Sequence, residues 1–264
     1  MKTTFIGDIH AAATDLAVLL TAPNLAQQQL VFLGNYIDSA VSSASAPLRV
    51  LELVRQQVIT KHAVALLGNH DDFWVQTAAG NELAYETWKL NHGQATWQQL
   101  GIKATDLTTV QAQLNQPPLA KYTQFLKHLP LMWQNQHFLA VHAGINWQLT
   151  LQQQTRHDLT WIQDSYFFDD PANPTNWHRN QSKKIMITGH TPVQTLTTGH
   201  RHYLKMQADA TDLPRYNIDA GSGSDLPASG ILGLTLTATG AESALDFVTK
   251  GQLQHQGDEH GEQD

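Results

Sequence analysis

The sequence predicts a layered α/β domain. Several short apolar runs, rich in β-branched and aromatic residues, end at glycine or histidine, and such runs are typical of buried strands. Between the earlier of these runs lie stretches whose apolar residues recur at helical spacing. Because strands that alternate with helices form a sheet covered by those helices, we expect the chain to fold in layers.

The expected elements follow one another along the chain. Strands are predicted at residues 3–7, 30–34, 63–68, 138–142 and 185–189, and helices at residues 14–20 and 47–59. The segment 81–128 has helical character, few strand signals and a break at Pro117-Pro118, which predicts an insertion of helices beside the core. Residues 216–250 alternate between apolar and polar around a turn at 238–240, which predicts a terminal β-hairpin.

The length of the chain, 264 residues, favours one large domain with a substantial core. We place this domain at residues 1–250, and we expect the polar, acidic stretch 251–264 to be a disordered tail because it has no periodicity. No apolar run approaches the roughly 20 residues of a membrane helix. The first predicted strand leaves no room for a signal peptide, so a cytoplasmic location is expected.

Composition limits the chemistry of any site. The chain has no cysteine, so a metal ion would be held by imidazole, carboxylate or amide groups, which suit Mn, Fe, Zn or Mg. A formal charge of -7 argues against non-specific binding to nucleic acid or to an anionic membrane. We therefore expect neither as a partner, and an anionic substrate would have to be attracted locally by metal.

Polar motifs follow five of the predicted strands. Asp8 and His10 come first, and an extended backbone would point both side chains the same way. Taken alone, this pair could equally be a loop aspartate that caps a helix. The other motifs are GNYID at 34–38, GNHD at 68–71, VHAG at 141–144 and GHT at 189–191. Since the carboxyl ends of strands form the ligand crevice of a layered α/β fold, these motifs are predicted to converge.

The motifs resemble those of the calcineurin-like metallophosphoesterases, in particular the bacterial members of the phosphoprotein phosphatase branch. The family pattern GDxHG, GDxxDRG, GNHE or GNHD, HAG or HGG and GHTP is matched at residues 7–10, 34–39, 68–71, 142–144 and 189–192. Segments 126–131, 158–162 and 218–221 add supporting context. The resemblance covers most of the chain and implies a four-layer α/β/β/α sandwich with a helical insertion.

The resemblance also implies a centre of two divalent metal ions, with Mn favoured. It assigns the metal ligands to Asp8, His10, Asn35, Asn69, His142 and His190. The first two would hold one ion, position 35 would bridge, and the remaining three would hold the other ion. Two such cations bind phosphate oxygens and lower the pKa of a bridging water, so that a metal-bound hydroxide attacks phosphorus.

Two further residues are implied to act in catalysis. His70 would protonate the leaving oxygen, and Asp38 would fix the tautomer of His70 and keep it charged. Asp71 and Asp72 could add negative charge nearby, or either could cap the helix that follows.

The sequence departs from the family pattern at the bridging position, where Asn35 stands in place of an aspartate. Two dications about 3.5 Å apart repel by about 19 kcal/mol at an effective dielectric of about 20, and anionic bridges offset that repulsion. An amide oxygen carries no charge, which leaves Asp8 as the only carboxylate among the implied ligands. We therefore predict weaker metal binding, or one tightly held ion.

Three arginines that clamp the substrate phosphate in the family are also missing. Their positions are taken by Ser39, Leu67 and Gln163, although many bacterial relatives already lack the second. Losing such contacts weakens phosphate binding. Candidate replacements, each of which could instead be a solvated surface residue, are Arg156, Arg179, Lys183 and Arg201.

Three functions fit these features. The leading one is a metal-dependent phosphatase acting on phosphomonoesters, with phosphoserine or phosphothreonine in proteins as one substrate class. The second is hydrolysis of dinucleoside polyphosphates or phosphodiesters, as in related family members. The third is a catalytically impaired relative that binds a phosphate ligand or a partner protein, and Asn35, Ser39 and Gln163 motivate it.

Overall fold

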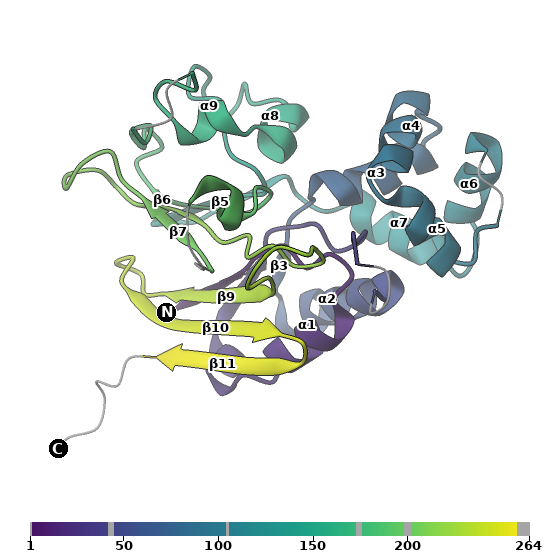
Figure 1. Cartoon of the computed structure of the whole chain (residues 1–264), viewed down its shortest axis with the longest axis horizontal. Helices are drawn as coiled ribbons and strands as arrows, with labels where there is room; N and C mark the ends of the chain where they lie inside the picture. The colour runs from purple at the N-terminus through teal and green to yellow at the C-terminus, as the bar shows by residue number, and fades with distance from the viewer. Residues whose placement is uncertain (1, 42–44, 104–105, 173–175, 198–201, 258–264) are drawn as a thin grey trace.

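The computed structural model describes residues 2–41, 45–103, 106–172, 176–197 and 202–257. Within these ranges two β-sheets pack face to face, and helices cover the outer side of each sheet (Figure 1). This is a four-layer α/β/β/α sandwich, so the predicted fold class is confirmed. None of the helices in these ranges combines the length and the apolar content needed to cross a bilayer.

The first sheet has the strand order β11-β10-β9-β1-β2-β3. Its strands are β1 (Thr3–Ile6), β2 (Gln29–Phe32), β3 (Val64–Ala65), β9 (Ile231–Leu236), β10 (Glu242–Thr249) and β11 (Gln252–Gly257). β1, β2 and β3 are parallel, with Phe5 paired to Val31, and β9 to β11 are antiparallel. Alternation sets the two faces, because Phe5 packs towards the second sheet and Ile6 towards the helices.

The second sheet has the strand order β4-β5-β6-β8-β7. Its strands are β4 (Met132–Gln134), β5 (Phe138–Val141), β6 (Ile185–Thr188), β7 (Leu204–Met206) and β8 (Arg215–Asn217). β5, β6 and β8 are parallel. Phe138 and Ile187 from this sheet share a buried cluster with Phe5 and Val31 from the first, so the central core lies between the sheets.

Helices form the two outer layers. The first sheet is covered by α1 (Ala13–Leu19) and α2 (Pro47–Lys61), with the 3₁₀-helix η1 (Pro23–Gln27) between them. The second sheet is covered by α8 (Arg156–Trp161), α9 (Asp164–Phe167) and α10 (Val193–Leu196). In α2, Pro47 suits the first helical turn, Val50 and Val54 face the core, and His62 ends the helix in the left-handed conformation.

A group of helices lies beside the sandwich and accounts for the predicted helical segment (Figure 1). It contains α3 (Asn69–Ala78), α4 (Glu82–Leu90), α5 (Gly93–Gln99), α6 (Leu107–Leu114) and α7 (Ala120–Lys127). Three buried tryptophans, Trp74, Trp88 and Trp97, pack at its centre, with ring centroids 6.2 Å apart for the first two and 5.3 Å for the last two. Burial of such large rings stabilises the group as a unit.

The predicted hairpin at 216–250 is present as β9 and β10, but the chain continues into a further strand. The prediction of a disordered tail from residue 251 is wrong for residues 252–257, which form β11. This strand pairs with β10 through backbone hydrogen bonds and keeps most side chains exposed, so no apolar alternation reveals it. Residues 258–264 lie outside the described ranges. The strand predicted at 63–68 is shorter than expected, at Val64–Ala65.

Candidate active site

The strand ends of both sheets meet at one place. Asp8 follows β1, Asn35 follows β2, and Asn69 begins α3 after the short loop that follows β3, while His142 follows β5 and His190 follows β6. The first four of these side chains are almost fully buried. The structure brings together the eight predicted site residues, Asp8, His10, Asn35, Asp38, Asn69, His70, His142 and His190, through hydrogen bonds and ring contacts. The backbone N–H of His190 joins the two halves of the site by donating to Asp8 Oδ1 at 3.1 Å.

Glycines in the motifs allow this close approach. A Cβ atom at Gly189 would lie 2.1 Å from Asp8 Oδ1, and a Cβ atom at Gly68 would lie 2.3 Å from the Asn35 backbone nitrogen. Any side chain at either position would push these groups apart.

Two histidines and one amide form the first part of the site. His142 Nδ1 lies 2.9 Å from the carbonyl oxygen of Leu33, which can only accept, so Nδ1 carries the proton and Nε2 has a free lone pair. That Nε2 lies 2.9 Å from Asn69 Oδ1, and the same oxygen lies 3.2 Å from His190 Nδ1. His190 Nε2 is buried without a hydrogen-bond partner. We call Asn69, His142 and His190 the histidine set.

The histidine set has the chemistry of a metal site. Burial lowers the pKa of His142 to about 4, and burial together with the neighbouring His142 lowers the pKa of His190 to about 3. Both imidazoles are therefore neutral at pH 7, the form in which histidine binds metal. A divalent cation would satisfy the converging lone pairs and the unpartnered nitrogen, so these residues fit the metal that the sequence implies.

The second part of the site contains Asp8, His10 and Asn35. His10 Nδ1 donates to the carbonyl oxygen of Asp38 at 3.1 Å, which turns Nε2 towards Asp8 Oδ2 at 3.7 Å. Burial favours the protonated form of Asp8, but the nearby histidines lower its pKa below the usual range. The carboxylate is therefore ionised, and it raises the pKa of His10 to about 9, so without metal the two form an ion pair and a bound cation would have to displace the proton of His10 Nε2.

The Asn35 side-chain amide lies between Asp8 and His10, and its N–H groups point towards both. Asn35 Nδ2 donates to Asp8 Oδ2 at 2.8 Å and lies 3.5 Å from His10 Nε2. Asn35 Oδ1 accepts from the backbone N–H of His70 at 3.1 Å, which fixes the orientation of the amide. A rotated amide would set its oxygen against the Asp8 carboxylate and its hydrogens against that N–H. The amide oxygen therefore points away from the place where a bridging ligand would act.

His70 and Asp38 form a hydrogen-bonded pair, which we call the dyad. His70 Nδ1 donates to Asp38 Oδ2 at 2.8 Å. Two residues of the helical insertion hold the carboxylate, because Trp88 Nε1 donates to it at 2.8 and 3.0 Å and Thr96 Oγ1 donates to Oδ1. Burial lowers the pKa of His70, whereas the hydrogen bond and the charge of Asp38 act to raise it.

A cavity of about 280 Å³ opens over these groups, and His10, Asn35, Asn69, His70 and His190 line it. We call it the metal-side cavity. Asp219, which follows β8, also lines it and is buried. Burial and the neighbouring Asp8 raise the pKa of Asp219 to about 8. In the sequence, the segment that contains Asp219 serves only to support the family resemblance, and Asp219 is not predicted as a site residue. Trp88 and Thr96 are not predicted as site residues either.

Asp71 has a structural role rather than an electrostatic one. Its carboxylate accepts the backbone N–H groups of Asn35 at 2.7 Å, Tyr36 at 2.9 Å and Gly68 at 3.1 Å. It therefore ties the loop after β2 to the start of α3. Asp72 instead forms an ion pair with Arg156, with Oδ1 and Nη1 2.8 Å apart.

Of the candidate replacements for the missing arginines, the three that lie in the described ranges do not line the metal-side cavity. Arg156 is paired with Asp72, and Arg179 forms an ion pair with Asp209. Lys183 is absent from the cavity wall, and Arg201 lies outside the described residues. Ser39 and Gln163, at two of the arginine positions, do line the cavity, and Ser39 Oγ donates to the carbonyl oxygen of Gly223 at 3.1 Å.

In the described ranges, no three His, Asp or Glu side chains converge closely enough to hold a metal by themselves. Two of the implied ligands, Asn35 and Asn69, are amides. A metal in the histidine set would therefore depend on the Asn69 oxygen as well as on the two imidazoles.

Comparison with known proteins finds a matching family model and similar structures. The family model for calcineurin-like phosphoesterases matches residues 1–221. A candidate diadenosine tetraphosphatase has a similar structure, with 14% identity, coverage of 98% of this chain and 95% of the other, and a TM-score of 0.58. A metallophosphoesterase from Sphaerobacter thermophilus is similar at 17% identity, 94% and 89% coverage and a TM-score of 0.50. A hypothetical protein from Pyrococcus horikoshii is similar at 11% identity, 97% and 87% coverage and a TM-score of 0.55. No curated protein matches the sequence.

Proposed function

The chain belongs to the calcineurin-like phosphoesterases, and on this basis we propose that it is a metal-dependent hydrolase of phosphomonoesters. The observation that carries the proposal is the histidine set, in which lone pairs of His142 and Asn69 converge at 2.9 Å in a buried place. Seryl or threonyl phosphate in proteins is one substrate class that this chemistry serves. A bound divalent cation would supply the charge that attracts the phosphate and activates water.

Different residues of the chain would hold the cation and handle the proton of the reaction. Asn69, His142 and His190 would hold the cation, and Asp8 and His10 would offer a second, weaker place for one. Hydrolysis joins a water oxygen to phosphorus, breaks the bond from phosphorus to the leaving oxygen, and leaves that oxygen in need of a proton.

The dyad is suited to handle this proton. Asp38 holds the Nδ1 proton of His70, so Nε2 is the nitrogen available on the cavity side. In its doubly protonated form, which the Asp38 carboxylate stabilises against burial, His70 would pass the Nε2 proton to the leaving oxygen, and the dyad fixes the ring in the orientation that this transfer requires.

The Asn35 amide favours one tightly held cation. Its hydrogens already occupy the Asp8 oxygen and approach the His10 nitrogen, so a cation there must displace a hydrogen bond. The histidine set makes no such competing contact with Asn35. We propose that the first equivalent of metal binds to the histidine set.

A specific observation also supports a second candidate, a catalytically impaired relative that binds phosphate ligands. Asn35 turns hydrogens rather than an oxygen towards Asp8, and the metal-side cavity has neither lysine nor arginine among its described lining residues. Both features would weaken stabilisation of the transition state.

One set of assays separates these functions. Turnover of p-nitrophenyl phosphate with added Mn is expected, with slower turnover of bis-p-nitrophenyl phosphate and of a dinucleoside tetraphosphate. Faster turnover of either of the last two would point to a phosphodiesterase or polyphosphate hydrolase. Mn binding measured by calorimetry without turnover of any of the three would favour the impaired relative and refute the proposed activity.

A further inference from the structure

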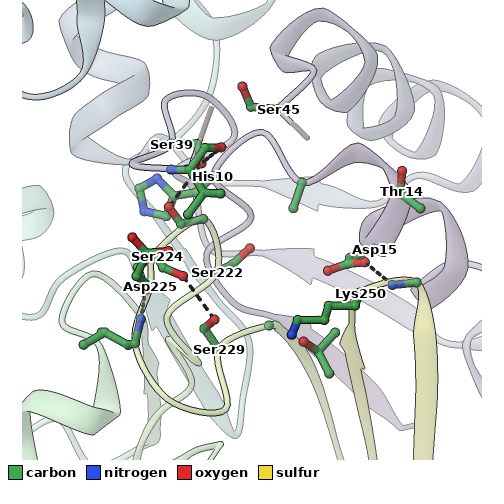
Figure 2. Close-up of a pocket in the computed structure, with 17 residues that line it drawn as sticks. His10, Thr14, Asp15, Ser39, Ser45, Ser222, Ser224, Asp225, Ser229 and Lys250 are labelled. Carbon is green, nitrogen blue, oxygen red and sulfur yellow. Dashed lines mark hydrogen bonds between the residues drawn. The ribbon is translucent and has the colours of Figure 1, made fainter. Parts of the chain in front are cut away.

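A second and larger cavity adjoins the metal-side cavity, and His10, Ser39 and Gly223 line both. Its volume is about 570 Å³, within the range of sites for small ligands. It extends past the first turn of α1 to the turn between β10 and β11, where Lys250 lies (Figure 2). We call it the Lys250 cavity.

The wall of the Lys250 cavity is rich in hydroxyl groups. Ser222 Oγ donates to the carbonyl oxygen of Ile9 at 2.7 Å, and Ser224 Oγ donates to that of Gly221 at 2.6 Å. Ser229 Oγ donates to the carbonyl oxygen of Ser224 at 3.2 Å. Each hydroxyl proton is thus committed to the backbone, and the remaining lone pairs can accept hydrogen bonds from a ligand.

The same wall gives no support for a nucleobase. The described residues that line the Lys250 cavity include no Phe, Tyr or Trp, and the one ring among them, the His10 imidazole, lies where this cavity meets the metal-side cavity, so a base near Lys250 would find no ring to stack on. Hydroxyl lone pairs instead suit a ligand that carries several hydroxyl groups of its own.

Lys250 is the one lysine or arginine among the described residues that line the two cavities. Its side chain extends from the turn into the Lys250 cavity, on the side of Ser229 (Figure 2). It does not line the metal-side cavity, so its charge serves a group other than the reacting phosphate. Asp15 and Asp225 also line the Lys250 cavity, and the first is engaged with the turn that carries Lys250.

The turn holds Lys250 in a position that suits lysine poorly. Thr249 pairs with Gln252, which leaves Lys250 and Gly251 as a two-residue loop with φ of 51° and 73°. Such a loop favours asparagine before glycine, because asparagine tolerates positive φ better than lysine does. Asp15 Oδ1 accepts the Gly251 N–H at 2.7 Å and anchors the loop to α1. The turn thus anchors the backbone of Lys250, and its exposed side chain can place a positive charge at the end of the cavity.

We propose that the Lys250 cavity binds the leaving group of the substrate, and that this group is hydroxyl-rich and bears a second anionic group that pairs with Lys250. Sugar bisphosphates and phosphorylated sugar acids have this chemistry. The inference rests on the proposed phosphomonoesterase function, which places the reacting phosphate in the adjoining metal-side cavity.

The test compares two ligands that differ by one anionic group, fructose 6-phosphate and fructose 1,6-bisphosphate, by calorimetric titration of the full-length protein with Mn. The wild type is expected to bind the bisphosphate about tenfold more tightly, since a hydrogen bond to a charged group contributes about that factor. Lys250→Asn should abolish the difference, and Lys250→Arg should keep it. Because asparagine suits this turn, the Lys250→Asn variant should fold, and thermal unfolding should show a cooperative transition.

Lys61→Gln, which removes an exposed lysine at the end of α2, is the matched control and should keep the tenfold preference. Equal binding of the two ligands by the wild type, or a preference that survives in Lys250→Asn, would overturn the inference. Turnover of p-nitrophenyl phosphate is measured on the same samples. A Lys250-dependent preference without any turnover would support the cavity assignment while refuting the proposed activity.

Discussion

Replacing Asn35 with aspartate tests the centre of the site, because it changes the charge of the side chain and leaves its shape almost unchanged. Asn35 Nδ2 now donates to Asp8 Oδ2 across 2.8 Å. In Asn35→Asp two carboxylate oxygens would face each other across that distance, and at an effective dielectric of about 20 they repel by about 332/(20 × 2.8), or about 6 kcal/mol. Without metal, the variant is therefore expected to be less stable than the wild type.

The introduced carboxyl can relieve this repulsion by taking up a proton. At neutral pH that costs an ordinary carboxyl about 4 kcal/mol, since its pKa is about 4 and each unit is about 1.4 kcal/mol. The metal-free variant should thus lose about 4 kcal/mol of stability, or about 10 °C in Tm. Repulsion raises the folded-state pKa above the unfolded value, so the loss is present at neutral pH and disappears as the pH falls below about 4.

Metal reverses the effect. A carboxylate between two dications offsets part of their repulsion of about 19 kcal/mol, so Asn35→Asp should bind a second equivalent of Mn and hydrolyse p-nitrophenyl phosphate faster. Calorimetric titration gives the stoichiometry, and thermal unfolding with EDTA or with Mn gives the stability. Asn81→Asp is the matched control, because Asn81 Oδ1 caps α4 by accepting the Ala84 N–H at 3.0 Å and aspartate caps equally well.

The reasoning fails if metal-free Asn35→Asp unfolds at the same temperature as the wild type at neutral pH. An unchanged Mn stoichiometry together with unchanged turnover would remove position 35 from the metal site. A loss of stability shared by Asn81→Asp would show that added charge, rather than its place, is responsible.

Three further predictions address the ligands, the dyad and the close packing of the site. His142→Ala should lower Mn affinity at least tenfold in calorimetry, whereas His137→Ala, which removes an exposed histidine, should not. Trp88→Phe removes a buried hydrogen-bond donor to the Asp38 carboxylate of the dyad, so kcat for p-nitrophenyl phosphate should fall about tenfold while the affinity for Mn stays the same. An unchanged kcat would refute a positioning role for Trp88. Gly189→Ala would set a Cβ atom 2.1 Å from an Asp8 oxygen, so stability should fall by about 1–3 kcal/mol and Mn affinity should fall with it. A variant with wild-type Tm and metal binding would contradict this last packing argument.

The strand ends were predictable because each motif joins an apolar run to a polar tip. A buried parallel strand appears in the sequence as an uninterrupted apolar run. The polar residues that follow it show where the chain leaves the core, as at Asp8 after Ile6 and His142 after Val141. The fold class then follows from the order of strands and helices. β11 escaped prediction because it is stabilised by backbone pairing to β10 and buries little apolar surface of its own.

The supporting residues of the site could not be read in the same way. Trp88 and Thr96 lie in helices whose apolar spacing predicts only a helical core, yet their polar atoms reach Asp38. That contact depends on how the insertion packs against the loop after β2, which is a long-range property. Lys250 was missed for a related reason, because it sits in a turn within the stretch interpreted as the end of the domain and the start of a tail.

The charges of Asp8 and Asp219 support the proposal of one tightly held cation rather than two. Asp8 is ionised, and Asp219 lies close enough for Asp8 to raise its pKa, so bound positive charge would ionise Asp219 as well. One dication would then be matched by these two carboxylates, whereas a second dication would find no further carboxylate among the residues assigned as metal ligands. The neutral amide of Asn35 cannot supply that negative charge, and its hydrogens oppose a cation beside Asp8. The same balance explains why a single carboxylate at position 35 is expected to change metal stoichiometry, stability and turnover together.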